Sequence, residues 1–249
     1  MIARIARIRR HPIKSAGGED LDRVGLHPAR PLPGDREWAV LTEAGEAHVG
    51  PGAPDRWLPK GCFLRGAASA SLQAVQGGWR DGALQLRHPD HPPISADPQT
   101  QGERLVDWLA QMWPQDKPAP SRIVRAPTAF TDVRWPWISI LSLDSLRALE
   151  SQMGRPLGIE RWRGNLWVEG WAPWAERGLP GQILRIGEVE LRVTQTIGRC
   201  AATSADPATG TIDLDMPEAL QRLYGNSDFG IYAEVASGGE IALNDEVRA

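Results

Sequence analysis

The chain has 249 residues, with 28 lysines and arginines against 31 aspartates and glutamates, and its net charge of −3 excludes the strongly basic surface of a typical nucleic-acid-binding protein. This length is enough for one large domain or two small ones whose cores need no disulfide or metal. The two cysteines, Cys62 and Cys200, are far apart and form no Cys-x-x-Cys pair, so no disulfide framework, iron–sulfur cluster or structural zinc site is indicated and a cytoplasmic location is expected.

The N-terminal segment M-I-A-R-I-A-R-I-R-R is basic but lacks the apolar stretch of a signal peptide, and no later run is long enough to span a bilayer. Strands are predicted over residues 2–10, 36–42, about 71–75 and 83–87, the last two around a Gly-Gly turn. Turns or loops are predicted at residues 43–46, 50–61 and 88–100. Apolar residues at helical spacing predict an amphipathic helix over residues 101–113.

The proline-rich segment 114–121 predicts a linker, and we place a domain boundary there, between residues 1–115 and 116–249. Strands are predicted in the second half near residues 122–126, 138–141, 166–168, 183–186, 189–193, 229–235 and 241–247. Capping residues predict helices from Ser142 to Gly154 and from Asp215 to Gly225. Short strands with frequent turns and a few helices indicate a β-rich α+β fold, as a barrel or curled sheet.

The clearest strand ends beside a cysteine. Residues 188–194 alternate polar and apolar side chains, the strand is expected to end at Gly198, and Arg199 and Cys200 follow before an Asp-Pro-x-Thr-Gly turn. Catalytic groups are often carried by loops that a rigid sheet positions, and a neighbouring cation favours thiolate, which is a nucleophile and a soft metal ligand. The alternative is that Cys200 is a small buried apolar residue.

Three short segments combine a cation with neutral hydrogen-bonding groups on loops at strand ends. They contain Lys14 and Ser15, Arg36, and Arg163 and Asn165. Lysine supplies a point charge and arginine a planar fork that suits phosphate oxygens. Together with the cysteine, these residues would form a pocket for a phosphorylated cofactor whose other end is a soft metal. Taken singly, each is as easily a solvated loop residue or an edge-strand arginine.

Two other features have ordinary alternatives. His88 and His91 could ligate a metal, but their proline-rich surroundings offer no helix face to align them and no third ligand is near in sequence. The eleven tryptophans, several of them beside proline or glycine, either line a pocket or fill the core.

The order of several segments resembles that of the MOSC-domain family, which includes the mitochondrial amidoxime reducing component and bacterial relatives. H-P-I-K-S and G-D-R-E-W-A-V are similar to Y-P-V-K-S and D-R-x-W-x-V of the MOSC N-terminal domain. R-W-R-G-N-L-W-V is similar to F-R-P-N-I-V-V, and I-G-R-C-A-A-T-S-A-D-P-A-T-G to S-R-C-x-x-T-x-x-D-P-x-T-G. F-G-I-Y and G-G-E-I-A-L-N-D-E-V are similar to F-G-x-Y and G-x-I-x-x-G-D-x-V.

The resemblance implies a MOSC β-barrel with a smaller N-terminal β-rich domain, and a molybdenum cofactor (Mo-molybdopterin) rather than pyridoxal phosphate. It implies that Cys200 ligates molybdenum and that Asp132 is the acidic residue near the metal. The residues that it assigns to the pterin and its phosphate are Lys14, Ser15, Arg36, Arg163, Asn165 and Arg199. The implied activity is that of an oxidoreductase that reduces N-hydroxylated compounds with electrons from a separate flavin or iron–sulfur protein.

The chain departs from the family pattern near the expected metal. It has Trp135-Pro136-Trp137 where relatives carry small polar residues, and Asp132 is out of register by a couple of positions. Gly164 replaces the proline of Arg-Pro-Asn, and Gly198 replaces a serine. The alternative functions are a sulfur carrier or cofactor-binding module that uses Cys200 without redox turnover, and a barrel that has lost the cofactor.

Overall fold

Strand β1 (Arg4–Arg10) lies between two strands that are far apart in sequence in the computed structural model, which describes residues 2–249. It is antiparallel to β10 (Leu166–Glu169) on one side and to β2 (Glu19–Leu21) on the other. Ile5 and Ile8 are fully buried and belong to the core, in a strand with a register shift between Ile5 and Arg7, whereas Ile2 before the strand is exposed. The predicted strand over residues 2–10 is confirmed.

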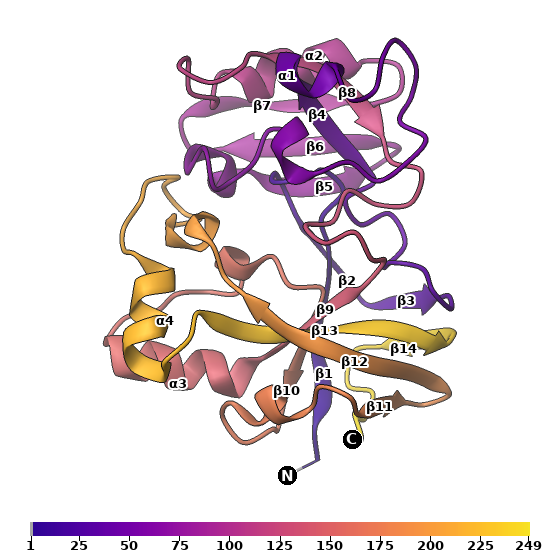
Figure 1. Ribbon diagram of the computed structural model, residues 1–249, viewed down its shortest axis with the longest axis vertical. Coiled ribbons are helices and arrows are strands. Elements are labelled where there is room, and N and C mark those ends of the chain that lie inside the picture. Colours follow the sequence, from indigo (N-terminus) through magenta and orange to yellow (C-terminus); the bar gives the residue numbers. More distant parts are fainter. Residues whose placement is uncertain (1) are drawn as a thin grey trace.

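The larger lobe is built on a seven-stranded sheet in the order β11-β12-β13-β9-β10-β1-β2 (Figure 1). The further strands are β9 (Ile138–Ser142), β11 (Ile183–Ile186), β12 (Val189–Gly198) and β13 (Asp228–Ser237). Only β9 and β10 pair in parallel; the other pairs are antiparallel. A separate ribbon of β3 (Arg23–Leu26) and β14 (Gly239–Ala242) adds Ile241 and Leu26 to the same aliphatic core.

The smaller lobe, at the top of Figure 1, has its own core. It contains the pair β4 (Trp38–Thr42) and β8 (Pro120–Arg125), and the three-stranded sheet β5 (Gln76–Arg80), β6 (Ala83–His88) and β7 (His91–Ala96). Helix α2 (Gly102–Ala110) packs its apolar face, with Leu105 and Leu109, against this core, and α1 (Glu43–Glu46) is one short turn. The β-rich α+β fold expected from the sequence is therefore observed.

Both capped helices of the larger lobe begin and end where the sequence predicts. In α3 (Leu143–Met153), the Ser142 hydroxyl accepts a hydrogen bond from the backbone N–H of Ser145 at 3.1 Å, and Gly154 ends the helix with φ +66°. In α4 (Met216–Tyr224), the Asp215 carboxylate accepts from the N–H of Glu218 at 3.0 Å and Gly225 closes the helix. Short 3-10 turns include η1 (Lys60–Cys62), η2 (Ser71–Ala74), η3 (Glu160–Trp162), η4 (Ala175–Gly178) and η5 (Ala201–Ser204).

The prediction for residues 71–80 is wrong. Residues 71–74 form η2, the strand β5 starts at Gln76, and Gly77 and Gly78 lie inside it rather than in a turn. Gly77 has φ +101°, and a Cβ there would lie 2.1 Å from the Gln85 carbonyl oxygen, so the glycines permit a close approach of backbones.

Two segments expected to be irregular are regular. Residues 91–96 form β7 despite Pro92 and Pro93, because β7 is an edge strand where a missing N–H is tolerated. Residues 43–46, predicted as a turn, form α1, whose N-cap is Thr42.

Strands from both sides of residue 115 pair with one another, β1 with β10 and β4 with β8. The division of the chain into residues 1–115 and 116–249 stays a prediction.

The turn after Cys200 touches the smaller lobe at Gly210. This residue has φ +71°, and a Cβ there would lie 2.9 Å from Cα of Ser71. Gly225 has a similar φ of +77° with no atom within 4 Å of the same position. We predict that Gly210→Ala lowers the free energy of unfolding by about 1–2 kcal/mol more than Gly225→Ala, which costs only the left-handed strain of about 1–2 kcal/mol. Urea denaturation of both variants checks this, and equal losses would mean that the lobes are not in contact here.

Candidate functional site

A single cavity of about 470 Å³ between the two lobes is lined by all eight residues that the sequence singled out. They are Lys14, Ser15, Arg36, Asp132, Arg163, Asn165, Arg199 and Cys200. Residues separated by up to 186 positions therefore share one space, although the roles predicted for them stay predictions.

Cys200 is exposed at the end of the longest strand pair of the sheet. Strand β12 ends at Gly198 after a register shift against β13, and the N–H of Arg199 donates to the Ser227 carbonyl at 2.9 Å. Cys200 is extended (φ −123°, ψ 177°) and caps the N-terminus of η5. The alternative that Cys200 is buried is wrong, whereas the other cysteine, Cys62, is buried in the smaller lobe.

A buried arginine forms hydrogen bonds to the segment that follows Cys200, which we call the cysteine loop (residues 200–205). Arg161, whose side chain is 1% exposed, donates to the carbonyls of Thr203 at 3.1 Å and Ala205 at 2.8 Å. Its charge is paired with Asp213 through two hydrogen bonds of 2.9 Å. Removal of one partner from so buried a pair is costly, so this clamp fixes the path of the loop.

A buried lysine, Lys14, forms an ion pair with Asp132 at the cavity. Lys14 Nζ donates to the Phe130 carbonyl at 2.9 Å and to Asp132 Oδ1 at 2.6 Å. Burial lowers the pKa of Lys14, with Asp132 opposing that shift. Burial alone would raise the pKa of Asp132, but the charge of Lys14, its hydrogen bond and the charge of Arg36 lower it to about 2. Asp132 therefore reaches the cavity as an anion.

Two arginines from opposite lobes join at the cavity wall. Arg36 donates to the Arg163 carbonyl at 2.9 Å and also pairs with Asp35. Arg163 donates to the carbonyls of Gly17 at 2.7 Å and Ile13 at 3.1 Å. Burial, and then the charge of Arg36, lower the pKa of Arg163 to about 9. Backbone carbonyls thus hold both guanidinium groups at the cavity wall, and within residues 2–249 only Arg36 of the two forms an ion pair.

Three cavity residues other than glycine have left-handed backbone conformations: Ser15 (φ 68°), Arg36 (φ 49°) and Arg163 (φ 50°). Each such residue costs of order 1–3 kcal/mol, and such strain gathers at sites where geometry matters for function. The same three residues belong to the loops predicted to hold a phosphate.

The side chains of Asn165 and Arg199 make most of their hydrogen bonds to other groups of the protein. Asn165 is 2% exposed, and its amide group bonds to the Ser139 hydroxyl at 2.8 Å and to the Arg9 carbonyl at 3.2 Å. Arg199 donates to the carbonyls of Phe229 at 2.8 Å and Trp162 at 3.1 Å. Both residues are part of the cavity wall, and only their remaining N–H groups are free to donate hydrogen bonds to a bound molecule.

The sequence did not single out four side chains that line this cavity, namely Lys60, Arg65, Trp137 and Tyr232, as site residues. Lys60 and Arg65 are exposed and form no ion pair or side-chain hydrogen bond within residues 2–249. Lys60 begins η1 and Arg65 follows that turn, and neither position has a recognisable local pattern. Trp137 and Tyr232 belong to segments quoted above, and the F-G-I-Y motif was the available signal for Tyr232.

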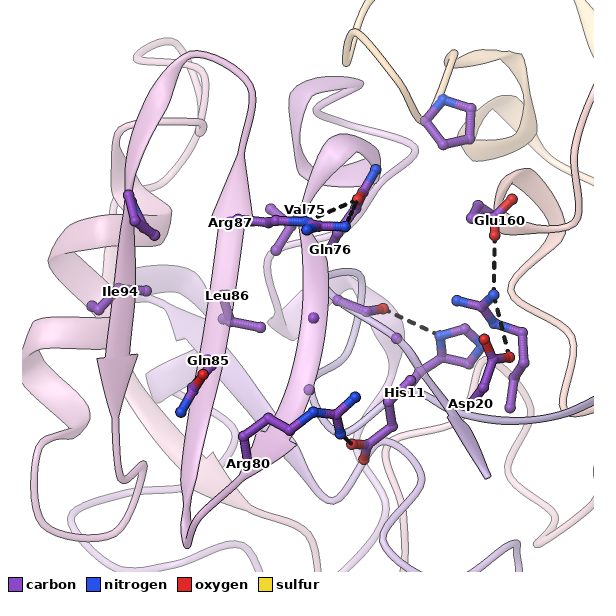
Figure 2. Close-up of a pocket in the computed structure, with 18 of the residues that line it drawn as sticks. His11, Asp20, Val75, Gln76, Arg80, Gln85, Leu86, Arg87, Ile94 and Glu160 are labelled. Carbon is purple, nitrogen blue, oxygen red and sulfur yellow. Dashed lines mark hydrogen bonds and ion pairs between the residues drawn. The ribbon is translucent and has the colours of Figure 1, made fainter. Parts of the chain in front are cut away.

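Figure 2 shows a second cavity, of about 720 Å³, lined by residues that include His11, Asp20 and Glu160. It shares Arg163 and Gln73 with the first cavity. Its charges are largely paired: Arg9 lies 3.0 Å from Glu160 and 3.6 Å from Asp20. Of the eight predicted residues only Arg163 lines it. The cavity at Cys200 is therefore the candidate site, although it is the smaller one.

No group of three or more His, Cys, Asp or Glu side chains in residues 2–249 is arranged to hold a metal ion. His88 and His91 lie in the smaller lobe with ring centroids 4.8 Å apart, and His88 Nε2 is 3.1 Å from the Ser71 hydroxyl. Within residues 2–249, no helix has the length and apolar character needed to cross a membrane.

Family models cover almost all of the chain. The model of the MOSC N-terminal beta barrel domain matches residues 2–121, and that of the MOSC domain matches residues 137–248. The chain belongs to the MOSC-domain family. The resemblance seen in the sequence is confirmed, and the cavity lies where the two MOSC segments meet.

Relatives in this family include several named for one activity. The chain is 24% identical to mitochondrial amidoxime-reducing component 1 of Danio rerio over 88% of its length and 73% of that protein. It is 31% identical to mitochondrial amidoxime reducing component 2 of Bos taurus over 44% of its length, a match that spans about a third (36%) of the bovine protein. Among solved structures, YuaD protein from Bacillus subtilis aligns over 99% of this chain and 94% of its own, with a TM-score of 0.45 and 14% identity.

His11, a buried residue that lines the second cavity, supplies a prediction about pH. Burial and then the charges of Arg163, Arg36 and Arg9 hold its pKa well below 6.5. The unfolded chain therefore binds the proton more tightly, and stability is lost as the pH falls below about 6.5. We predict that between pH 7 and pH 5 the wild type loses about 1 kcal/mol more unfolding free energy than His11→Gln. Equal slopes in urea denaturation at the two pH values would contradict this.

Proposed function

We propose that this protein is a molybdenum-cofactor-dependent reductase of N-hydroxylated compounds, with Cys200 as the protein ligand to molybdenum. The observation that carries the proposal is the single cavity that places an exposed thiol together with cations drawn from both lobes. The names of the amidoxime-reducing relatives support the choice of substrate class.

The chemistry of the donor set fits a phosphorylated pterin. Seven lysine and arginine side chains line the cavity, and Asp132 is its one carboxylate among the described residues. Burial lowers the pKa of Arg199 to about 10, and burial together with the charge of Arg36 lowers that of Arg163 to about 9. A phosphate dianion would relieve this excess, and a thiolate beside it is a ligand suited to a soft metal.

Each residue of the chain then has a defined task. Lys14, Arg36 and Arg163 would hold the phosphate, with Ser15 and the remaining N–H groups of Asn165 and Arg199 binding the pterin. The strained backbone at Ser15 and Arg163 fixes these donors before the cofactor arrives, which lowers the cost of binding. Asp132 is held as an anion by Lys14 and would keep that lysine oriented.

The reaction consumes two electrons and two protons for each N–O bond broken, and it yields the reduced nitrogen compound and water. When bound, the cofactor supplies the two-electron redox chemistry of this step. Electrons would come from a separate flavin or iron–sulfur protein. The chain contributes the position of the substrate and the walls that separate the reacting bond from bulk water.

The second candidate function, a sulfur carrier, is supported by the same exposed thiol. A persulfide on Cys200 would also be stabilised by the cations of the cavity. This role needs the thiol and the charges but neither the metal nor the N-hydroxylated substrate.

Removal of the thiol separates the two functions. Wild-type protein purified from a host that makes the cofactor should contain about one molybdenum per chain, and Cys200→Ala should lose most of it because the ligand is gone. Cys62→Ala is the matched control, since Cys62 is buried outside the cavity and its loss should leave the metal content unchanged. Elemental analysis and intact-protein mass spectrometry provide the readout. Equal molybdenum in Cys200→Ala and wild type would contradict the ligand assignment, and a persulfide on metal-free Cys200 would favour the carrier.

A further inference from the structure

Three neighbouring aromatic side chains, which we call the aromatic ladder, extend from an exposed position to the wall of the candidate site; they are Trp135, Trp137 and Tyr232. Trp135 is 56% exposed and stacks on Trp137 with ring centroids 6.2 Å apart and an interplanar angle of 25°. Trp137 in turn lies 5.8 Å from the ring of Tyr232. Trp137 and Tyr232 both line the cavity that contains Cys200. Trp135 therefore extends the aromatic surface of the cavity wall to an exposed position.

Two cationic side chains that line the same cavity have no carboxylate partner within residues 2–249. Lys60 and Arg65 come from the smaller lobe, are exposed, and form no ion pair within residues 2–249. Of the other five cations, Lys14, Arg36 and Arg161 pair with Asp132, Asp35 and Asp213. Arg163 and Arg199 donate their side-chain hydrogen bonds to backbone carbonyls. Lys60 is close enough to Asp132 to lower the pKa of that carboxylate, so its charge is felt inside the site.

We propose that the site selects planar aromatic N-hydroxylated substrates that also carry a negatively charged group. The substrate ring would stack on the ladder of Trp135, Trp137 and Tyr232, and the anionic group would pair with Lys60 and Arg65. The inference rests on the proposed function, and it adds a substrate class set by features that lie outside the predicted cofactor residues. Aromatic faces favour offset stacking, and guanidinium and ammonium groups bind carboxylate and phosphate.

Binding of three probes to cofactor-loaded protein without an electron donor tests the proposal, because no turnover occurs. The probes are 4-carboxybenzamidoxime, benzamidoxime and acetamidoxime, measured by isothermal titration calorimetry. We expect benzamidoxime to bind about threefold to tenfold more tightly than acetamidoxime, as stacking predicts. The carboxylate should add about threefold to tenfold more, an advantage that weakens with salt.

Four variants assign these advantages to side chains. Trp135→Ala should remove most of the aromatic advantage, and Trp135→Phe should keep it. The double variant Lys60→Gln, Arg65→Gln should remove the carboxylate advantage and leave benzamidoxime binding unchanged. Arg23→Gln is the matched control, since Arg23 is 68% exposed on β3 outside the cavity and its loss should change nothing. Thermal melting of each variant shows that it is folded.

Equal binding of benzamidoxime and acetamidoxime would overturn the aromatic part of the proposal, as would an unchanged ratio in Trp135→Ala. An unchanged carboxylate advantage in the double variant would overturn the ionic part. Failure of the proposed function is seen separately, as protein that lacks molybdenum or reduces no N-hydroxylated compound. A role of the tryptophans in packing alone would lower the melting temperature without changing the ratio of affinities.

Discussion

The excess of positive charge in the cavity is the constraint on which the rest of this structure depends. Seven lysine and arginine side chains share a space that one carboxylate lines, and mutual repulsion would drive them apart without compensation. Lys14, Arg36 and Arg161 pair with Asp132, Asp35 and Asp213. Arg163 and Arg199 are held by backbone carbonyls instead, those of Gly17 and Ile13 for Arg163 and that of Phe229 for Arg199. Because carbonyls are neutral, they orient the cations without cancelling them, and the site keeps its attraction for an anion.

This arrangement requires both lobes. Arg36 in the smaller lobe donates to the carbonyl of Arg163 in the larger one, and Arg163 donates back to the loop before β2. The close approach of Gly210 to Ser71 brings the turn that follows the cysteine loop against the smaller lobe. The chain runs from β1 in the larger lobe to β4 in the smaller lobe (Figure 1), and Lys14, on the segment between β1 and β2, lines the cavity. Neither lobe alone would present a thiol and a phosphate-binding set together.

Local chemistry explains which parts of this fold could be predicted from the sequence. The caps at Ser142 and Asp215 and the alternation that leads to Cys200 act over a few residues, so their positions were correct. Gly77 was misread as a turn because its purpose, a close backbone contact with β6, involves another strand. The prolines of β7 were misread because an edge position cannot be recognised before the sheet is known.

The candidate site divides in the same way. The order of the sequence motifs identified Lys14, Arg36, Arg163 and Cys200 as candidate site residues, and in the structure all four line one cavity. Lys60 and Arg65 were missed because only tertiary packing brings η1 and the residues after it to the cavity, and no spacing in the sequence marks them. Asn165 was predicted to bind a cofactor, and its buried hydrogen bonds to Ser139 and Arg9 show that it also joins three strands.

Anomalous diffraction at the molybdenum edge, from crystals of protein made in a host that supplies the cofactor, tests the central claim most directly. The account predicts a metal peak bonded to the sulfur of Cys200 and a phosphate group between Lys14, Arg36 and Arg163. A metal that is bound elsewhere, or a phosphate seated in the neighbouring groove between Arg9 and Glu160, would contradict it.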